Sequence, residues 1–138
     1  MVKNILIIQA RINSKRLYNK VFLKIDKNLS FLDLLLRRIK KVKNLDKIIL
    51  AVPFKDKNEF KKKKFNSVEL FSGPERNVLK RFFIIANNYK PENIIRITSD
   101  CPFVDPKLIN KLLSMMDVIV NEMMLLKITR CIGGHISI

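Results

Sequence analysis

Two uninterrupted apolar runs constrain the fold of this 138-residue chain more than any other feature of its sequence. Ile5–Ile8 and Ile48–Val52 contain no polar residue and are rich in β-branched side chains, which is typical of strands buried on both faces of a parallel sheet. We expect Ile5–Ile8 to be the first and central strand. Further strands are predicted at Val68–Phe71 and Asn93–Ile97, and Pro53 closes the second one.

The segments between these runs have the spacing of amphipathic helices. Ser30 can cap the first, Asn77–Tyr89 forms the second, and Asp105-Pro106 opens the third with an N-cap and a proline at the first helical position. A charged stretch at 58–64 is a weaker candidate. The predicted buried positions of the three helices are Phe31, Leu35, Ile39 and Val42; Val78, Phe82, Ile85, Ala86 and Tyr89; and Leu108, Ile109, Leu112 and Leu113.

The alternation of strand and helix predicts an α/β fold, in which helices cover both faces of a mostly parallel sheet and the crossovers are right-handed. A chain of 138 residues can bury one ordinary core, so we expect a single globular unit. Ligands of such folds bind at the carboxyl ends of the strands. The loops after Ile8, Phe71 and Ile97 are therefore the places where a functional site is expected.

Neither a membrane segment nor a cysteine site is expected. No apolar run approaches the roughly 20 residues that span a bilayer, and the N-terminal run is too short for a signal peptide, which together predict a cytoplasmic protein without membrane contact. Cys101 and Cys131 form no CxxC pair and are expected to be reduced thiols. Because the single histidine, His135, lies in the tail, Cys101 is not expected to act as a nucleophile.

The net charge of +16 is the one extreme value of the composition. A balance of this size often marks a partner rich in phosphate. Here, however, lysines are spread along the chain with one run at Lys61–Lys64, and aromatic residues do not alternate with them as a base-stacking surface requires. We favour a solvated basic surface and keep nucleic-acid binding as the less expected alternative.

Basic residues gather directly after the first strand. Arg11, Lys15, Arg16 and Lys20 follow it at the mouth of the expected crevice, and Ser14 adds a hydroxyl donor. Guanidinium groups can bind phosphate oxygens through two parallel hydrogen bonds, and a lysine neutralises charge as a mobile cation, so this set complements a triphosphate. The alternative, from composition alone, is a solvated basic loop.

Two further clusters follow later strands. Asp100, just past the strand at 93–97, is placed where a divalent cation that bridges phosphates needs an oxygen ligand; a turn former or helix cap is the alternative. Gly73–Asn77 leads into a helix, where backbone N–H groups suit an anion or the polar edge of a base. The alternative for that segment is an ordinary loop in which Asn77 only caps the helix.

Taken in order, these segments resemble the cytidylyltransferases of spore-coat polysaccharide biosynthesis, which belong with the acylneuraminate and 3-deoxy-manno-octulosonate cytidylyltransferases. The resemblance spans about residues 3–113. The matching residues are Ala10, Arg11, Ser14, Arg16, Leu17, Lys20 and Val21; Gly73, Val78, Leu79 and Arg81; and Arg96, Ile97, Thr98, Asp100, Cys101, Pro102, Asp105 and Pro106.

The resemblance implies a Rossmann-like fold of the nucleotide-diphospho-sugar-transferase type. It also implies a magnesium-dependent transfer of CMP from CTP to a sugar or sugar acid, with release of pyrophosphate. By this resemblance Arg11, Arg16 and Lys20 hold the triphosphate, Asp100 ligates Mg²⁺, and the loop Gly73–Asn77 lies near the base. Of these, Arg11, Lys20 and Asp100 are assigned to catalysis. The other matched positions assigned to the nucleotide are Ala10, Ser14, Arg81 and Thr98.

The tail departs from the family pattern. Past about Met116 the family continues with a strand ending in an Asn, more sheet, a sugar-binding region and a second acidic metal ligand, and here only Asp117–Asn121 resembles that strand. We therefore expect residues 1–116 to form the nucleotide-binding domain and 117–138 to be an atypical tail, with the C-terminal part of the fold missing through truncation or a frame shift. The alternative function is that of an inactive nucleotide-binding remnant, and the sequence leaves open whether the chain forms a homodimer.

Overall fold

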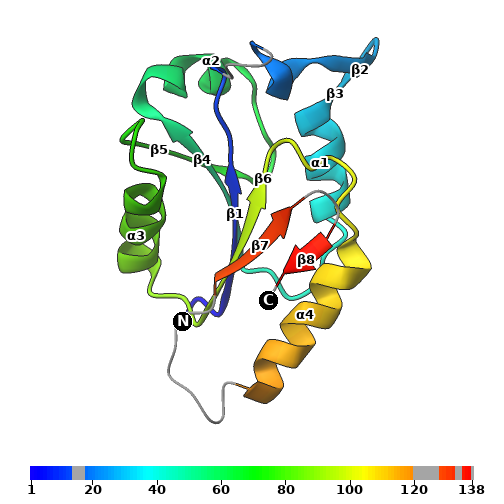
Figure 1. Cartoon of the computed structure of the whole chain (residues 1–138), viewed down its shortest axis with the longest axis vertical. Coiled ribbons are helices and arrows are strands. Elements are labelled where there is room, and N and C mark those ends of the chain that lie inside the picture. The colour runs from blue at the N-terminus through cyan, green and yellow to red at the C-terminus, as the bar shows by residue number, and fades with distance from the viewer. Residues whose placement is uncertain (14–17, 120–127, 133–134, 138) are drawn as a thin grey trace.

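The computed structural model describes residues 1–13, 18–119, 128–132 and 135–137, and a single sheet organises them (Figure 1). The strand order is β5-β4-β1-β6-β7-β8, and every neighbouring pair is parallel except β7 and β8. The predicted strands are all present and β1 lies inside the sheet, as expected for the first apolar run. The strands of this sheet are β1 (Asn4–Gln9), β4 (Lys47–Pro53), β5 (Glu69–Gly73), β6 (Asn93–Thr98), β7 (Ile128–Ile132) and β8 (His135–Ser137).

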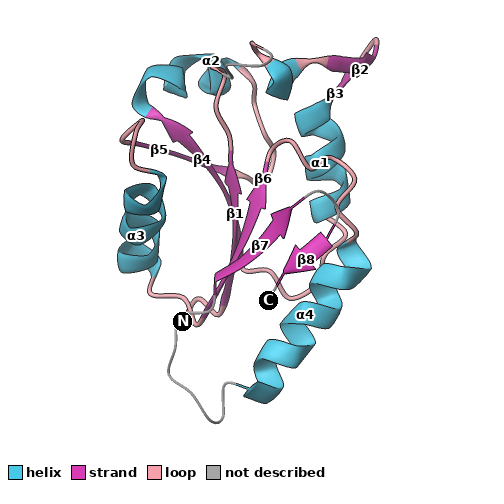
Figure 2. Ribbon diagram, viewed as in Figure 1, coloured by secondary structure: helices cyan, strands magenta, loops and turns pink. Residues whose placement is uncertain are grey.

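Side chains of β1 alternate between two apolar cores, one on each face of the sheet. Leu6 and Ile8 pack in the core that includes buried residues of α1 (Phe31–Ile39) and α4 (Pro106–Ile119), whereas Ile5 and Ile7 pack with residues of α3 (Val78–Tyr89). All four side chains are fully buried. Successive residues of a strand point to opposite faces, so a continuous apolar run is what a sheet covered on both sides requires. Figure 2 shows α3 on one side of the sheet and α1 and α4 on the other.

The helices begin where the sequence placed their caps. At α1 the hydroxyl of Ser30 accepts a hydrogen bond from the Asp33 N–H (3.2 Å), and the Asp33 carboxylate accepts one from the Ser30 N–H (2.9 Å), which completes a capping box. At α3 the side-chain oxygen of Asn77 accepts from the Lys80 N–H at 2.8 Å. The charged stretch forms the short helix α2 (Lys57–Lys62), as predicted.

Three details of the helix predictions are wrong. The buried face of α1 includes Leu32 and Leu36 and leaves Phe31 partly exposed, so the apolar stripe is rotated by about one residue. On α4, Leu108 was expected in the core but is 44% exposed, whereas Met116, which was not predicted, is buried there. Helix α4 also continues to Ile119, so the strand suggested at 117–121 is helical in its described part.

Two features of the chain were not predicted. A small antiparallel hairpin of β2 (Lys24–Asp26) and β3 (Leu29–Ser30) stands apart from the main sheet beside α1. After α4, β7 adds to the sheet in parallel beside β6, and β8 follows it antiparallel. The division at residue 116 stays a prediction, because these strands show only that the backbone beyond it rejoins the sheet.

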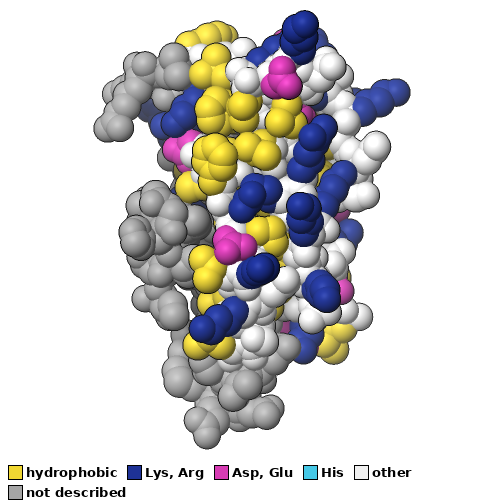
Figure 3. Space-filling view, turned by 90° about the vertical axis from the view of Figure 1, so that its right-hand side faces the viewer, with side chains coloured by type: hydrophobic (Ala, Val, Ile, Leu, Met, Phe, Trp, Pro, Cys, Tyr) yellow, Lys and Arg dark blue, Asp and Glu magenta, His cyan; other side chains and the backbone are white. Residues whose placement is uncertain are grey.

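Lysine and arginine side chains are dispersed over the face that carries α1 and α4. Figure 3 shows them interspersed with apolar side chains on that face, together with a few acidic ones. Across the described ranges, no helix has both the length and the apolar character to cross a bilayer.

Candidate active site

A cleft of about 270 Å³ opens at the carboxyl ends of β1 and β6. The parallel register places Gln9 beside Thr98, so the loops that leave the two strands start from neighbouring points. A larger hollow, of about 770 Å³, lies at the opposite end of β4 and β5 and contains none of the predicted site residues. The smaller cleft is therefore the candidate site. Its lining residues are Gln9, Ala10, Arg11, Lys20, Val21, Phe31, Arg96, Thr98, Ser99 and Asp100.

Backbone hydrogen bonds continue the sheet past the ends of these strands and fix the rim of the cleft. The Ala10 N–H donates to the Ala51 carbonyl at 3.1 Å, and the Ser99 N–H donates to the Gln9 carbonyl at 2.9 Å. Ala10 is buried, whereas Arg11 is exposed. Ile12, the next residue, is buried again, so Arg11 alone turns outward at this point and lies at the rim.

The structure brings together five of the residues that the sequence predicted for the site. Arg11 and Lys20 supply two cations and Asp100 one exposed carboxylate, while Ala10 and Thr98 complete the wall between them. Their roles toward a ligand stay predictions. Ser14 and Arg16, assigned with them to the triphosphate, and Lys15 lie outside the described residues.

Arg96 is a cation of this cleft to which the sequence assigned no role. Its Nη2 donates to the Gln9 side-chain oxygen at 2.6 Å, and its guanidinium carbon lies 5.3 Å from the centre of the Phe82 ring. An arginine in the middle of an otherwise apolar strand was a usable signal, because a buried sheet position accepts a charge only where partners compensate it.

Asp100 lies in a tight turn that follows β6. The Cys101 N–H donates to the Thr98 carbonyl at 3.1 Å, and Cys101 is a free thiol whose sulfur lies 3.4 Å from the Thr98 hydroxyl. Asp105 caps the N-terminus of α4, because its carboxylate accepts a hydrogen bond from the Lys107 N–H at 2.9 Å. Asp100 is therefore not the cap of α4, and its carboxylate has no hydrogen-bond or ion-pair partner within the described part of the chain.

The residues of the cleft could hold a magnesium ion only together with ligands from a bound substrate and water. Among the described residues no group of three or more His, Cys, Asp or Glu side chains is arranged to hold a metal. Mg²⁺ commonly binds through one or two carboxylates, with water and substrate phosphates as the other ligands. One free carboxylate beside two or three cations meets that requirement where a triphosphate supplies the remaining oxygens.

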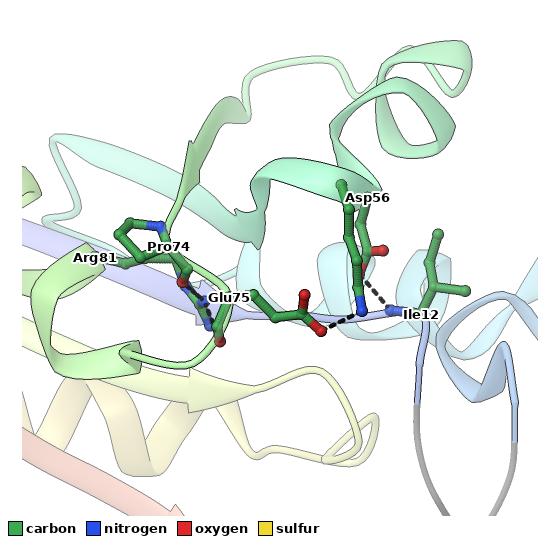
Figure 4. Close-up of polar contacts among 6 residues, drawn as sticks. Ile12, Asp56, Pro74, Glu75 and Arg81 are labelled. Carbon is green, nitrogen blue, oxygen red and sulfur yellow. Dashed lines mark hydrogen bonds and ion pairs between the residues drawn. The ribbon is translucent and has the colours of Figure 1, made fainter.

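The loop before α3 is organised by Arg81, which is 1% exposed. Its Nη1 donates to the carbonyls of Pro74 and Glu75, so a buried guanidinium closes the loop onto the helix (Figure 4). Burial lowers the pKa of Arg81, and the positive charge of Arg11 lowers it further, but a guanidinium stays protonated at neutral pH. Arg81 is thus near the site and holds the loop in shape; direct contact with a nucleotide stays a prediction.

The packing of Arg81 and Phe71 against Gly73 leaves no room for a side chain there. A Cβ at this position would lie 2.7 Å from the Cγ of Arg81 and 3.2 Å from the Cε1 of Phe71. The predicted importance of Gly73 therefore has a steric cause that does not involve a ligand. Asn77 likewise caps α3 with its side-chain oxygen, as the simpler alternative proposed, and its assignment to the nucleotide stays a prediction.

Asp56 is a charged residue near the cleft that sequence reasoning missed. It ends the short 3₁₀ helix after β4 (Phe54–Asp56), is 4% exposed, and accepts a hydrogen bond from the Ile12 N–H at 2.9 Å. Its neighbour Lys55 pairs with the carboxylate of Glu75. An acid three residues beyond Pro53, at the carboxyl edge of the sheet, was the available signal.

Comparison with known proteins identifies the family. A sequence model described as cytidylyltransferase matches residues 5–124. The chain belongs to the cytidylyltransferase family. The resemblance found in the sequence motifs is thereby confirmed.

Two curated relatives share most of the chain. An uncharacterised protein of Methanocaldococcus jannaschii is 44% identical over 112 residues, which cover 80% of this chain and 46% of that protein. The spore coat polysaccharide biosynthesis protein SpsF of Bacillus subtilis is 36% identical over 110 residues, which cover 75% of this chain and 45% of SpsF. The chain thus spans about half the length of the curated relatives it matches.

Solved structures share the fold. A cytidylyltransferase from Leptospira borgpetersenii superimposes with a TM-score of 0.72 at 29% identity, over 83% of this chain and 49% of that one. A CMP:2-keto-3-deoxy-manno-octonic acid synthetase complexed with CTP superimposes with a TM-score of 0.69 at 18% identity, over 84% and 48%. The expected fold, a mostly parallel α/β sheet of the nucleotide-sugar transferase type, is confirmed.

Proposed function

We propose that this chain carries the CTP site of an enzyme that transfers CMP to a sugar or sugar acid for surface polysaccharide synthesis. The observation that carries the proposal is the convergence of Arg11, Lys20, Arg96 and Asp100 on one cleft at the carboxyl ends of β1 and β6. Family membership supports the reaction class, SpsF supports the pathway, and the CTP complex of a protein with the same fold supports the nucleotide. A cytoplasmic location follows from the proposed substrate.

The proposed reaction needs charge neutralisation and alignment more than a covalent group. A sugar hydroxyl oxygen attacks the α-phosphorus of CTP and gives its proton to solvent, while the bond from that phosphorus to the bridging oxygen breaks and pyrophosphate leaves. Arg11 and Lys20, with Ser14 and Arg16, bind the triphosphate and neutralise the leaving group, and Thr98 and Ala10 line the wall. Asp100 would hold Mg²⁺ together with the phosphates, and the bound ion would supply electrostatic stabilisation of the phosphoryl oxygens. The base lies toward Gly73 and Asn77.

The domain division belongs to the same proposal. Residues 1–116 contain both apolar cores and every described residue of the cleft, which is what a nucleotide-binding domain requires. Sugar recognition is assigned to a region outside it. If that region or a second acidic ligand is lacking, nucleotide binding without turnover is the expected behaviour.

Ligand-dependent thermal stability tests the nucleotide claim. A ligand that binds only the folded state stabilises it, by about 2.7 kcal/mol at a concentration one hundred times its Kd. CTP with Mg²⁺ should therefore raise the Tm of the chain. Asp100→Asn should remove the part of the shift that depends on Mg²⁺, while Glu92→Gln, an exposed carboxylate before β6, should leave it unchanged. Absence of any shift in the wild-type chain would refute the proposal.

Turnover is tested separately, by pyrophosphate release from CTP with a panel of sugars and sugar acids. Release that depends on both Mg²⁺ and one acceptor supports the enzyme. Binding of CTP without release, across the whole panel, supports the nucleotide-binding remnant instead. The two measurements together distinguish a failure to bind from a failure to react.

A further inference from the structure

The turn after β4 contacts two loops that flank the proposed CTP site. Asp56 accepts a hydrogen bond from the Ile12 N–H at 2.9 Å, next to Arg11 in the segment after β1. The preceding residue, Lys55, pairs with Glu75 in the loop before α3. Figure 4 shows the hydrogen bond from Ile12 to Asp56 together with the contacts that Glu75 and Arg81 make in the loop before α3. Neighbouring residues of one short turn thus join the segment of Arg11 to the loop near the expected base.

The burial of the two contacts differs. Asp56 is 4% exposed and its hydrogen bond to Ile12 is buried, whereas the side chains of Lys55 and Glu75 are 40% and 52% exposed. A buried charge-assisted hydrogen bond is strong and its loss is costly, because the group left behind cannot return to water. An exposed ion pair contributes much less. Of these two contacts, the hydrogen bond from Ile12 to Asp56 is therefore the stronger constraint on the Arg11 segment.

Asp56 also balances positive charge beside the cleft. The buried guanidinium of Arg81 experiences repulsion from Arg11 and attraction from Asp56. A small hollow of about 50 Å³ is lined by all three residues. Without the Asp56 carboxylate, the positive charges of Arg11 and Arg81 beside this hollow would be less compensated, and Arg11, the exposed one, is the one free to move away.

We propose that Asp56 is a positioning residue for triphosphate binding: its buried carboxylate holds the Ile12 N–H and offsets the charge of Arg81, so that Arg11 stays directed to the cleft. This inference rests on the proposed function. Asp56 acts through the backbone and through Arg11, and it has no contact with the nucleotide of its own.

The experiment compares three ligands on the full chain. Asp56→Asn keeps the size of the side chain and removes its charge. It is expected to weaken binding of CTP and of inorganic tripolyphosphate by about tenfold, while binding of cytidine stays within about twofold. Glu59→Gln is the matched control, because it removes an exposed charge on the adjacent helix and should change none of the three affinities. A merely structural role would weaken all three ligands together.

The Ile12 amide provides a readout that does not depend on any variant. In the wild-type chain without ligand, Ile12 is expected to exchange its amide hydrogen as slowly as the β1 amides do, although it lies outside the strand. Fast exchange would overturn the proposal even where Asp56→Asn fails to fold. So would equal affinities of the wild-type chain and Asp56→Asn for tripolyphosphate.

The outcomes separate the two claims. If the wild-type chain binds neither CTP nor tripolyphosphate, the proposed function fails and the role of Asp56 fails with it. If the wild-type chain binds both and Asp56→Asn binds them equally well, only the positioning role is refuted.

Discussion

Replacing Gly73 with alanine tests how closely the loop beside the cleft is packed. The backbone of Gly73 does not require the left-handed conformation that favours glycine, so alanine is compatible with its dihedral angles. The obstacle is Arg81, whose Cγ would lie 2.7 Å from the new Cβ and whose Cδ would lie 3.2 Å from it. Arg81 is fully buried and its Nη1 is bound to the Pro74 and Glu75 carbonyls, so it cannot retreat without losing those bonds.

The magnitude follows from these contacts. Overpacking a core commonly costs about 1–3 kcal/mol, and a lost hydrogen bond to a charged group about 1.5–3 kcal/mol. The lower conformational entropy of the unfolded alanine chain offsets about 0.4–1 kcal/mol. We expect Gly73→Ala to lower the free energy of unfolding by about 2 kcal/mol. For a chain of this size that is a fall in Tm of roughly 8 °C.

A double-mutant cycle separates the steric effect from any other. Urea denaturation followed by circular dichroism gives the free energy of unfolding of the wild-type chain, both single variants and the double variant. In the Arg81→Ala background only the 3.2 Å approach to the Phe71 ring remains, and Gly73→Ala should then be close to neutral or stabilising by up to about 1 kcal/mol. A loss of about 2 kcal/mol in both backgrounds would refute the assignment of the effect to Arg81.

Two further predictions concern pH. The Lys3 and Asn4 N–H groups both donate to the Asp46 carboxylate (2.7 and 2.8 Å), and the bond from Asn4, then that from Lys3, lowers the pKa of Asp46 below its usual value of 3.8. Because the pKa of Asp46 is lower in the folded state than in the unfolded state, its stabilisation is complete at neutral pH and is lost as pH falls through the folded pKa. Since Asp46 is exposed, Asp46→Asn should lower the free energy of unfolding by about 1 kcal/mol or less at pH 7. In urea denaturation, the difference between the wild-type chain and Asp46→Asn should vanish in acid. A hydrogen bond donated to Glu69 raises the pKa of Tyr89 to about 12, so its stabilisation is complete below pH 10 and is lost as pH rises toward 12. Tyr89→Phe should remove a phenolate absorbance step near pH 12 in an alkaline titration, and persistence of that step would contradict the assignment.

Local physics explains which parts of the fold were predictable. β1 and the face of α3 follow from patterns that only a doubly covered sheet and an amphipathic helix satisfy, and the Ser30 and Asn77 caps follow from short-range hydrogen bonding. The rotated face of α1 was missed because its leucine-rich sequence fits more than one helical stripe. Packing, rather than periodicity, selects Leu32 over Phe31.

The candidate site was predictable in part for the same reason. Arg11 and Asp100 could be placed because each directly follows a strand, and the carboxyl ends of parallel strands lie together. The role of Asp56 could not be read from its neighbours, since its partner Ile12 is 44 residues away and offers only a backbone N–H, which every non-proline residue carries. Arg81 was matched by its motif, but its role in holding the loop before α3 depends on the Pro74 and Glu75 carbonyls, which only the fold brings to it.

The central position of β1 has a consequence for the order in which the chain can fold. β1 is synthesised first, yet its partner on one edge begins at Lys47 and its partner on the other ends at Thr98. At roughly 5–20 residues per second, an apolar strand with an unpaired edge therefore waits on the order of 5–20 s during translation. The buried hydrogen bond from the Asn93 side chain to that of Asn4, which spans 89 positions, can form only at the end of that interval. A fragment that stops before β6 would keep this edge open and should aggregate.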